Sequence, residues 1–356
     1  MSTLPRISVV LATYKRAETL RETLRHLREQ TLAPEDFEVI VIDDGSPDHT
    51  ADIVEAARAE CRFSMTYLHH ANRGPGFTQN RGIRLARAPI VLLMADDIFM
   101  SPGALQAHLD THARHPSPSV AVLGRVLQSP TLTGTVFLAK WNPFRLGDLP
   151  DGATLPYTLF WACNISLDRE FMLAHGMFRD ERGRGGAANH EDVELGYRLH
   201  HQGMQLVFAR EALGHHHHVE TLAGTLRRSY ERGLNWEDFR RRVPEPEMDI
   251  RYRVYNLASL FARRHELSER REYLLGPDRS LARLSLIFVV RSMVFNRLTV
   301  HALWLPLFAA AERAGWLAAL LRENMYRGVI AYYFLKGCRD GPRHFAALPR
   351  SNPTSS

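Results

Sequence analysis

The segment Phe37-Glu-Val-Ile-Val-Ile-Asp-Asp-Gly-Ser46 decides the fold of the chain. Its β-branched, apolar first part predicts a buried strand, and the strand ends abruptly in two carboxylates and a glycine turn. A similar apolar run, Ile7–Thr13, precedes it. Leucines spaced along residues 19–30 predict a helix between the two strands.

The alternation of strands and helices continues along the chain. We expect helices over 50–59 and 76–86, and strands over 65–69 and 89–94. This order predicts βαβ units, and therefore an α/β fold with a mostly parallel sheet flanked by helices. Later segments are less regular. The expected elements there are strands over 120–126, 157–165 and 206–209 and a helix over 191–202.

Composition is that of a globular protein. The 356 residues are 45% hydrophobic and 24% charged, with a net charge of +6; this allows one large domain or two modest ones. Three widely spaced cysteines, Cys61, Cys163 and Cys338, fit a reducing compartment. We expect no secretory signal and a cytoplasmic location, peripheral on the inner membrane face if the chain meets a membrane.

Polar and acidic residues follow three of the first four predicted strands. They are Thr13-Tyr14, Asp43-Asp44 and Asp96-Asp97. Ligands of parallel α/β sheets bind at the carboxyl ends of the strands, so these residues are expected at one site. Each pair also has a plain structural explanation, since Asp43-Asp44 suits a turn and helix cap, and Asp96-Asp97 an exposed acidic loop. Alternatively, Asp96-Asp97 could hold a hard divalent cation.

Two later clusters carry further candidates. Acidic residues from Glu191 open a predicted helix, where they either complement the helix dipole or include a general base. Four consecutive histidines, 215–218, follow the 206–209 strand. Neighbouring side chains of an extended segment alternate between faces, so these imidazoles cannot all enter one site. They form either a solvated loop or a source of one metal ligand.

In this order, the segments resemble glycosyltransferase family 2, whose fold is GT-A. The resemblance runs from Ile7 to about Trp236. It rests on motifs at 7–16, 37–46, 74–82, 164–169, 176–180 and 191–198. It implies a Rossmann-like GT-A sheet with a mainly helical C-terminal region after it.

The resemblance also implies roles for individual residues. Tyr14 would stack on the nucleobase and Asp44 would bond its imide edge. Asp192 would be the catalytic base, with Glu191 positioning the acceptor or the metal. The implied nucleotide-sugar contacts are Ala12, Thr13, Tyr14, Arg16, Asp43, Asp44, Asn80, Arg81 and Asp96. Trp161 and Asn164 are implied on the acceptor side.

The implied metal is Mn²⁺ or Mg²⁺. Its candidate ligands are Asp97 and Asp96, with His215 and His217 from the histidine run. Met94 is a departure, because many members of the family carry a further acid at that position.

The resemblance therefore implies an inverting glycosyltransferase. A nucleotide diphosphate sugar, with UDP expected as its carrier, would be attacked by a hydroxyl of a sugar, lipid-linked or other acceptor, in polysaccharide, glycolipid or glycoconjugate synthesis. The alternatives are a sugar-phosphate nucleotidyltransferase and a non-catalytic nucleotide-sugar-binding scaffold. The first usually has a glycine-rich loop after its first strand, which 12–16 lacks, and the second would have lost the acids.

The predicted domains are a catalytic domain over 1–225, a helical region over 226–348 and a flexible tail over 349–356. In the helical region no uncharged run reaches the ~18–20 residues that span a bilayer. Its aromatic residues and arginines fit either helices packed in the fold or a dimer, or a membrane surface. No nucleic-acid-binding signature accompanies the arginines, so no nucleic-acid partner is expected.

Overall fold

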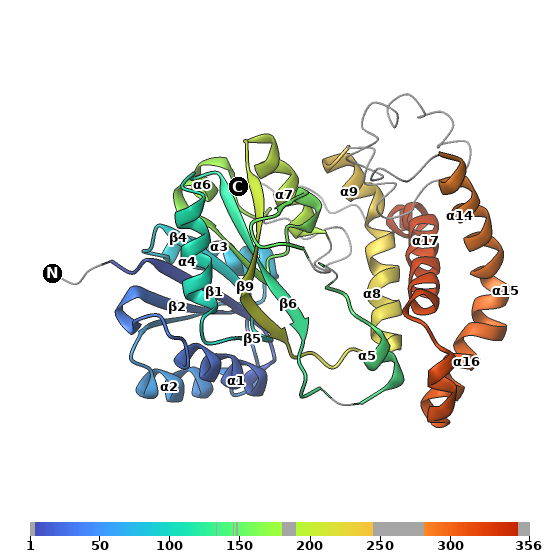
Figure 1. Cartoon of the computed structure of the whole chain (residues 1–356), viewed down its shortest axis with the longest axis horizontal. Coiled ribbons are helices and arrows are strands. Elements are labelled where there is room, and N and C mark those ends of the chain that lie inside the picture. The colour runs from blue at the N-terminus through green and yellow to red at the C-terminus, as the bar shows by residue number, and fades with distance from the viewer. Residues whose placement is uncertain are drawn as a thin grey trace. The chain divides into compact units, whose positions relative to one another are not determined.

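A computed structural model describes residues 4–132, 134–144, 146, 149–179, 190–244 and 281–347 (Figure 1). The chain divides into two compact units. The first comprises 1–132, 142–182 and 186–219, and the second 133–141, 183–185 and 220–356. The predicted tail, 349–356, lies outside the described residues, as does 245–280 within the predicted helical region.

The first unit is built on one mixed sheet. In the described parts of the chain it has nine strands, in the order β3-β2-β1-β4-β8-β6-β9-β5, with β7 paired to β9. The strands are β1 (Ile7–Thr13), β2 (Phe37–Asp43), β3 (Ser64–His69), β4 (Ile90–Ala95), β5 (Ile98–Met100), β6 (Val120–Gln128), β7 (Thr154–Leu155), β8 (Asn164–Asp168) and β9 (Gln205–His216). The first four are mutually parallel. β8 then runs antiparallel to both β4 and β6, and β5 and β7 run antiparallel to β9.

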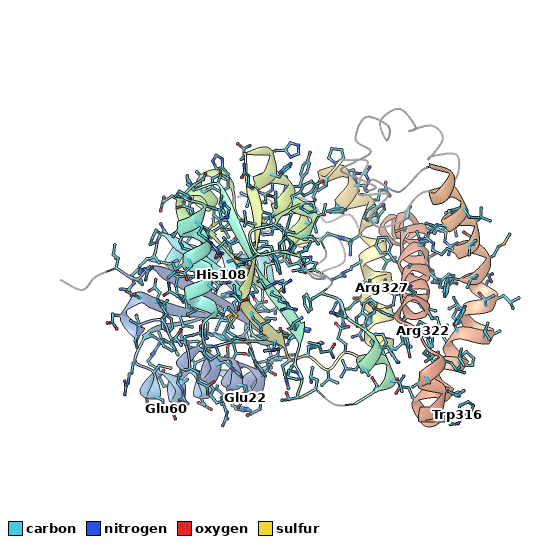
Figure 2. The ribbon with its side chains drawn as sticks, viewed as in Figure 1. Glu22, Glu60, His108, Trp316, Arg322 and Arg327 are labelled. Atoms are coloured by element: carbon cyan, nitrogen blue, oxygen red, sulfur yellow. The ribbon has the colours of Figure 1, made fainter. Side chains whose placement is uncertain are left out.

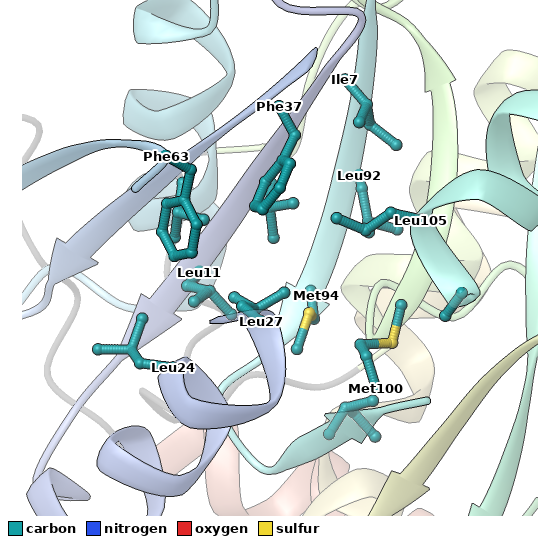
Figure 3. Packing of buried hydrophobic residues seen from close by; sticks show 14 of the residues in the cluster. Ile7, Leu11, Leu24, Leu27, Phe37, Phe63, Leu92, Met94, Met100 and Leu105 are labelled. Atoms are coloured by element: carbon teal, nitrogen blue, oxygen red, sulfur yellow. The ribbon is translucent and has the colours of Figure 1, made fainter. Parts of the chain in front are cut away.

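Helices cover both faces of this sheet. They are α1 (Ala17–Arg28), α2 (Thr50–Glu60), α3 (Pro75–Leu85), α4 (Ala104–Arg114), α6 (Arg169–His175) and α7 (Glu191–His201), with short turns η1 (Pro34–Asp36) and η2 (Tyr157–Leu159). Alternate residues of β1 point to opposite faces. Leu11 packs with Leu24 and Leu27 of α1 (Figure 3). On the other face Val10 meets α3 at Gly82, where a Cβ would lie 2.3 Å from the Val10 side chain.

The predicted α/β class and the parallel arrangement of the first four strands are confirmed. Two expected strands differ from those observed. Residues 157–159 form the turn η2, because Tyr157 and Phe160 pack against Gly196 of α7. The strand expected at 206–209 continues to His216, because it pairs with β6 and β5 along its length. β5 and α4 were not predicted.

The second unit is helical in its described residues, as expected of the C-terminal region. Its elements are α5 (Val136–Lys140), α8 (Leu222–Leu234), α9 (Trp236–Arg242), α14 (Leu281–Val294), α15 (Arg297–Thr299), the π-helical η3 (Val300–Trp304), α16 (Leu305–Arg313), η4 (Gly315–Leu320) and α17 (Glu323–Ala347). α8 and α17 approach closely, since a Cβ at Gly337 would lie 2.1 Å from the Tyr230 carbonyl oxygen. A second core surrounds Phe308 and Tyr326, whose rings stack at 4.1 Å.

Candidate functional site

Thr13 joins the two acidic pairs at the carboxyl edge of the parallel strands. The register of the strands sets Thr13 beside Asp43. The Thr13 carbonyl accepts a 2.9 Å hydrogen bond from the Asp44 amide, and its hydroxyl donates one of 2.7 Å to Asp96 Oδ2. All four residues are buried. The prediction that these acids meet at one edge of the sheet is therefore confirmed in geometry.

The two acids after β2 have different surroundings. Asp43 accepts hydrogen bonds from the Ser46 amide at 2.8 Å and from the Tyr67 hydroxyl at 2.8 Å, which fixes the turn. Asp44 accepts from the Asn72 side chain and from the amides of Arg73 and Gly74, at 2.6 to 3.0 Å. Asp44 thus anchors the segment 72–74, which leads into α3.

A histidine that the sequence analysis missed stands next to Asp44. His70 Nδ1 lies 3.6 Å from Asp44 Oδ1. Its Nε2 atom is buried, and it has no hydrogen-bond partner in the described structure. Tyr14, which is 40% exposed, directly follows β1. The Lys15 ammonium lies 4.9 Å from the centre of the Tyr14 ring. A buried polar atom without a partner and an exposed flat ring are features of a site for a polar aromatic ligand.

Arg16 binds both carboxylates at the end of β4. Its Nη1 lies 2.9 Å from Asp96 Oδ1 and 2.5 Å from Asp97 Oδ2. Burial raises the pKa of Asp96 to about 6, although Arg16 acts against the shift. Burial would raise the pKa of Asp97 as well, but His216, Arg16 and His218 outweigh it and lower that pKa to about 2. Asp97 therefore carries a fixed negative charge, whereas Asp96 can accept a proton near neutral pH.

The structure decides which histidines face Asp97. β5 pairs with β9 so that Ile98 lies beside His216, next to Asp97 in the chain. His216 Nε2 and His218 Nδ1 are 3.6 and 3.8 Å from Asp97 Oδ2. The predicted His215 and His217 alternate with them along the chain: the His217 backbone amide donates a 2.7 Å hydrogen bond to the Asp97 carbonyl, but among the described residues no ion pair joins either imidazole to the Asp97 carboxylate. His217 stacks on Phe99 at 4.7 Å, with Nδ1 3.2 Å from the Ser129 hydroxyl.

The side chains around Asp97 are of types that bind a divalent ion. In the part of the chain that the structure describes, they do not surround a common point where an ion could sit. In the described residues no three His, Cys, Asp or Glu side chains form a metal-binding group. A carboxylate flanked by two imidazoles is a donor set that suits Mn²⁺-like ions. In this structure the Arg16 guanidinium forms ion pairs with Asp96 and Asp97 and neutralises their charge. Of the candidate ligands, Asp97, His216 and His218 are those that the structure brings together.

The predicted base, Asp192, lies close to the same site. Its Oδ2 accepts a 3.1 Å hydrogen bond from the Ala162 amide. Burial raises the pKa of the Cys163 thiol, and the charges of Asp192 and Asp97 raise it further. The Cys163 carbonyl also accepts a 3.1 Å hydrogen bond from the Ala95 amide, which connects this segment to the end of β4. Glu191 lies near the start of α3, where a Cβ at Gly76 would be 3.2 Å from Glu191 Oε2.

A short aromatic series connects the acceptor-side and histidine residues. The Phe144 ring lies 5.7 Å from the Trp161 ring and 5.0 Å from the His216 ring. Trp161 is half-buried and adjoins the Ala162 amide that binds Asp192. Phe144 was not predicted, because it stands in an irregular segment that has no motif.

Two of the predicted contacts, Asn80 and Asn164, are hydrogen-bonded within the fold. Asn80 is buried and exchanges hydrogen bonds of 2.7 and 3.0 Å with the Phe178 backbone. Asn164 is fully buried, with its amide bonded to His108 Nε2 and to the Ala212 carbonyl, each at 2.9 Å. The side chains of both asparagines therefore form hydrogen bonds within the protein, next to the site. Arg81 is half-buried on α3, and Ala12 lies between Ile42 and Ala95 in the sheet.

Comparisons with known proteins find glycosyltransferases. The model of Glycosyl transferase family 2 matches residues 8–152. Validoxylamine A glucosyltransferase of Streptomyces hygroscopicus subsp. limoneus is 34% identical over 239 residues, which cover 60% of this chain and 52% of that protein. A poly(ribitol-phosphate) beta-N-acetylglucosaminyltransferase of Staphylococcus aureus is 31% identical over 110 residues, covering 30% of this chain and 19% of that protein. The chain thus spans about half the length, or less, of these curated relatives.

A solved structure has the same fold. The mannosyltransferase of Pyrobaculum calidifontis, in complex with GDP-mannose and Mn²⁺, aligns with a TM-score of 0.58 at 17% identity. The alignment covers 96% of this chain and 88% of that one. This likeness confirms the predicted GT-A type of fold. Together with the family match over 8–152 and the acids at the ends of β2 and β4, it leads to one conclusion: the chain has a fold of GT-A type and is similar to glycosyltransferase family 2 over residues 8–152.

Proposed function

We propose that this chain transfers a sugar from a nucleoside diphosphate donor to an acceptor hydroxyl, with inversion at the anomeric carbon. The observation that carries the proposal is the placement of Asp97 and Asp192 at one end of the segment 162–163: the Ala162 amide binds Asp192 Oδ2 at 3.1 Å, and the Cys163 carbonyl accepts a 3.1 Å hydrogen bond from the amide of Ala95, two residues before Asp97. One carboxylate belongs to a group suited to a cation and the other is a candidate base. A single displacement needs a stabilised leaving group and a base on the opposite side of the sugar.

The nucleobase end of the donor would lie between Tyr14 and the Asp44–His70 pair. The exposed Tyr14 ring offers a stacking surface. The buried Nε2 of His70, which has no partner in the described residues, offers a polar contact to the base or ribose. We take UDP as the first carrier to test, and a hexose as the transferred sugar. The name of the glucosyltransferase relative supports the hexose.

Asp97, His216 and His218 would hold the divalent ion. Such an ion supplies a Lewis acid that neutralises charge developing on a diphosphate leaving group. The low pKa of Asp97 supports this role, because a ligating carboxylate must be ionised. Arg16 would be free to turn toward the phosphates once Asp97 has another cationic partner. The presence of Mn²⁺ in the mannosyltransferase complex supports the choice of this ion.

Asp192 would take the proton from the attacking hydroxyl. Its Oδ2 is held by the Ala162 amide, which keeps the carboxylate beside Trp161. Trp161 would then offer an aromatic surface to a sugar ring of the acceptor. Asp192 would transfer the proton to solvent after the new glycosidic bond forms and the nucleoside diphosphate departs.

A donor panel tests this proposal. UDP-glucose, UDP-galactose, UDP-N-acetylglucosamine, dTDP-glucose, GDP-glucose and GDP-mannose would each be incubated with the protein and Mn²⁺ or Mg²⁺. We expect one carrier to raise the melting temperature and to be slowly hydrolysed. Proton NMR during early turnover should show the sugar released from an α-linked donor first as the β anomer. Release of the α anomer would contradict inversion, and a panel with neither binding nor turnover would contradict nucleotide-sugar transfer.

A further inference from the structure

Large exposed hydrophobic side chains are concentrated in one part of the second unit. Among the described residues there are eleven such side chains, and seven of them lie between residues 286 and 320. This exposed apolar set consists of Leu286, Val290, Met293, Leu298, Leu303, Trp316 and Leu320. Such a concentration exceeds the scattered exposed hydrophobics of an ordinary soluble surface, and marks an interaction surface.

The exposed set is distinct from the packed side of the same elements. Val300, Phe308 and Ala311 are buried in the second core, together with Tyr326 and Val329 of α17. On α14, Leu286, Val290 and Met293 are spaced four and three residues apart, so they share one face of the helix. The segment from α14 to η4 is therefore apolar on the side that packs against α17 and also on a side that meets solvent. A helix of an ordinary soluble domain has charged residues on that second side.

The charges within the same segment have nearly one sign. Between residues 286 and 320 the chain has three arginines, Arg291, Arg297 and Arg313, and a single carboxylate, Glu312; Arg322 and Glu323 follow η4. The oxygens of Glu312 accept hydrogen bonds of 2.8 and 2.9 Å from the first amides of α5. Arg297, Arg313 and Arg322 are exposed. The surface therefore combines apolar side chains with cations, which is complementary to an anionic partner that also offers an apolar phase.

We propose that the segment from α14 to η4 docks on the surface of a bilayer that contains anionic phospholipids. The exposed apolar set would enter the interfacial zone, and Arg297, Arg313 and Arg322 would contact phosphate groups. Trp316, whose ring is 74% exposed, would lie at the interface that indoles prefer. Figure 2 shows Trp316 at the end of the helices that carry the set, directed away from α17. A second copy of the same surface would instead bring like charges together.

The segment lies on the bilayer and does not cross it. No single helix of the described residues is long and apolar enough to cross a membrane. The pair Leu286–Val294 and Arg297–Arg313, bent by 44°, meets the length and composition test together. Crossing would bury Arg291 and Arg297 in hydrocarbon, which is costly. It would also expose the polar backbone at the bend, whereas docking on the surface leaves the second core intact.

Vesicle flotation of the full chain tests this surface. The protein would be mixed with phosphatidylcholine vesicles, or with vesicles that also contain about one-third phosphatidylglycerol, at low and at high salt. We expect it to float with the anionic vesicles at low salt and to bind less at high salt. The variant Leu298→Gln/Trp316→Gln should lose binding by roughly tenfold or more. Leu4→Gln/Leu85→Gln, two exposed hydrophobics outside the set, should bind as wild type.

Several outcomes would overturn the proposal. Absence of flotation with either vesicle, or unchanged flotation of Leu298→Gln/Trp316→Gln, removes the lipid surface. Light scattering could show that the wild type is a dimer and that Leu298→Gln/Trp316→Gln is a monomer. If the wild type also fails to float, the surface binds a second copy of the chain. Quenching of Trp316 by bromines deep in the acyl chains, measured against Trp316→Phe, indicates a crossing segment. Donor hydrolysis is measured in the absence of vesicles. A failure of vesicle binding can therefore be distinguished from a failure of the proposed transferase activity.

Discussion

Nη1 of Arg16 lies 2.5 Å from Oδ2 of Asp97, so one cation of the chain already neutralises the acid expected to bind a divalent ion. Removing that cation should leave Asp97 free for Mn²⁺. We expect Arg16→Gln to bind Mn²⁺ a few-fold more tightly than wild type in the absence of donor, measured by the loss of the free-ion signal in electron paramagnetic resonance. Arg21→Gln, an exposed position on α1, the helix that follows Arg16, should leave the affinity unchanged. Weaker Mn²⁺ binding by Arg16→Gln would show that Arg16 supports the ion site.

The two faces of the histidine run provide a matched comparison. His216 and His218 lie 3.6 and 3.8 Å from Asp97 Oδ2, whereas His217 contacts Phe99 and Ser129. His216→Asn and His218→Asn should each weaken Mn²⁺ binding by roughly tenfold or more, since each removes a nitrogen ligand. His217→Asn should retain the wild-type affinity in the same titration. Equal losses in all three variants would mean that the effect comes from the fold of the strand.

Asp192→Asn separates chemistry from binding. The amide oxygen can still accept the hydrogen bond from Ala162, but the group can no longer take a proton. Transfer should fall by about 10²–10⁴-fold. The affinity for the nucleoside diphosphate, measured by calorimetry, should change little. The control Asp110→Asn makes the same change at an exposed position on α4 and should match wild type in both measurements. Wild-type turnover in Asp192→Asn would exclude Asp192 as the base.

A buried histidine should make the protein sensitive to acid. His108, labelled in Figure 2, is fully buried and hydrogen-bonded to Asn164 and Ser166, and burial lowers its pKa to about 4. Between pH 6.5 and 4 the unfolded chain binds a proton at this residue that the folded chain does not. The free energy of unfolding should therefore fall as the pH falls through this range, by roughly 3 kcal/mol from His108 alone.

Urea titrations at several pH values measure this dependence. His108→Gln should be less stable at pH 7 than wild type, because it loses buried hydrogen bonds, but its stability should depend less on pH. The control His69→Gln replaces an exposed imidazole and should keep the wild-type dependence. An unchanged pH dependence in His108→Gln would contradict the role of this residue.

The close approach of α8 and α17 should be intolerant of any side chain at Gly337. A Cβ there would lie 2.1 Å from the Tyr230 carbonyl oxygen and 2.9 Å from the Cα of Gly233, so the two helices would have to separate. We expect Gly337→Ala to cost about 1–3 kcal/mol of unfolding free energy in urea denaturation. Gly315→Ala, where no atom lies within 4 Å of the added Cβ, is the control. Equal stability of the two variants would contradict this description of the packing.

The first half of the fold could be predicted because its signals are local. Ile7–Thr13 and Phe37–Asp43 are mainly apolar, and both are strands, as expected of central parallel strands. The 157–165 segment has the same apolar character, but there the packing of Tyr157 and Phe160 on α7 determines the backbone. Non-local packing of this kind leaves no pattern in the sequence.

For the site, the positions of residues along the chain could be predicted, but the directions of their side chains could not. The order of motifs placed Asp44, Asp96, Asp97 and Asp192 near one sheet edge, and the structure places them there. Side-chain direction could not be predicted. Asn164 sits at a motif position, yet its amide is used by His108 and Ala212 in the core. The choice between the two histidine pairs depended on the pairing of β5 with β9, and β5 was not predicted.

The last residues of β9, Gly214–His216, pair with both β5 and β6 and determine which imidazoles face the acid at the end of β4. Successive residues of a paired strand point in opposite directions, so the number of residues in this paired end sets the phase of the histidines that follow. Loss or gain of one residue within the paired end would exchange His216 and His218 for His215 and His217 at Asp97. Loss or gain of two residues would restore the original phase. Relatives that conserve this site should therefore differ in the length of this paired end by even numbers.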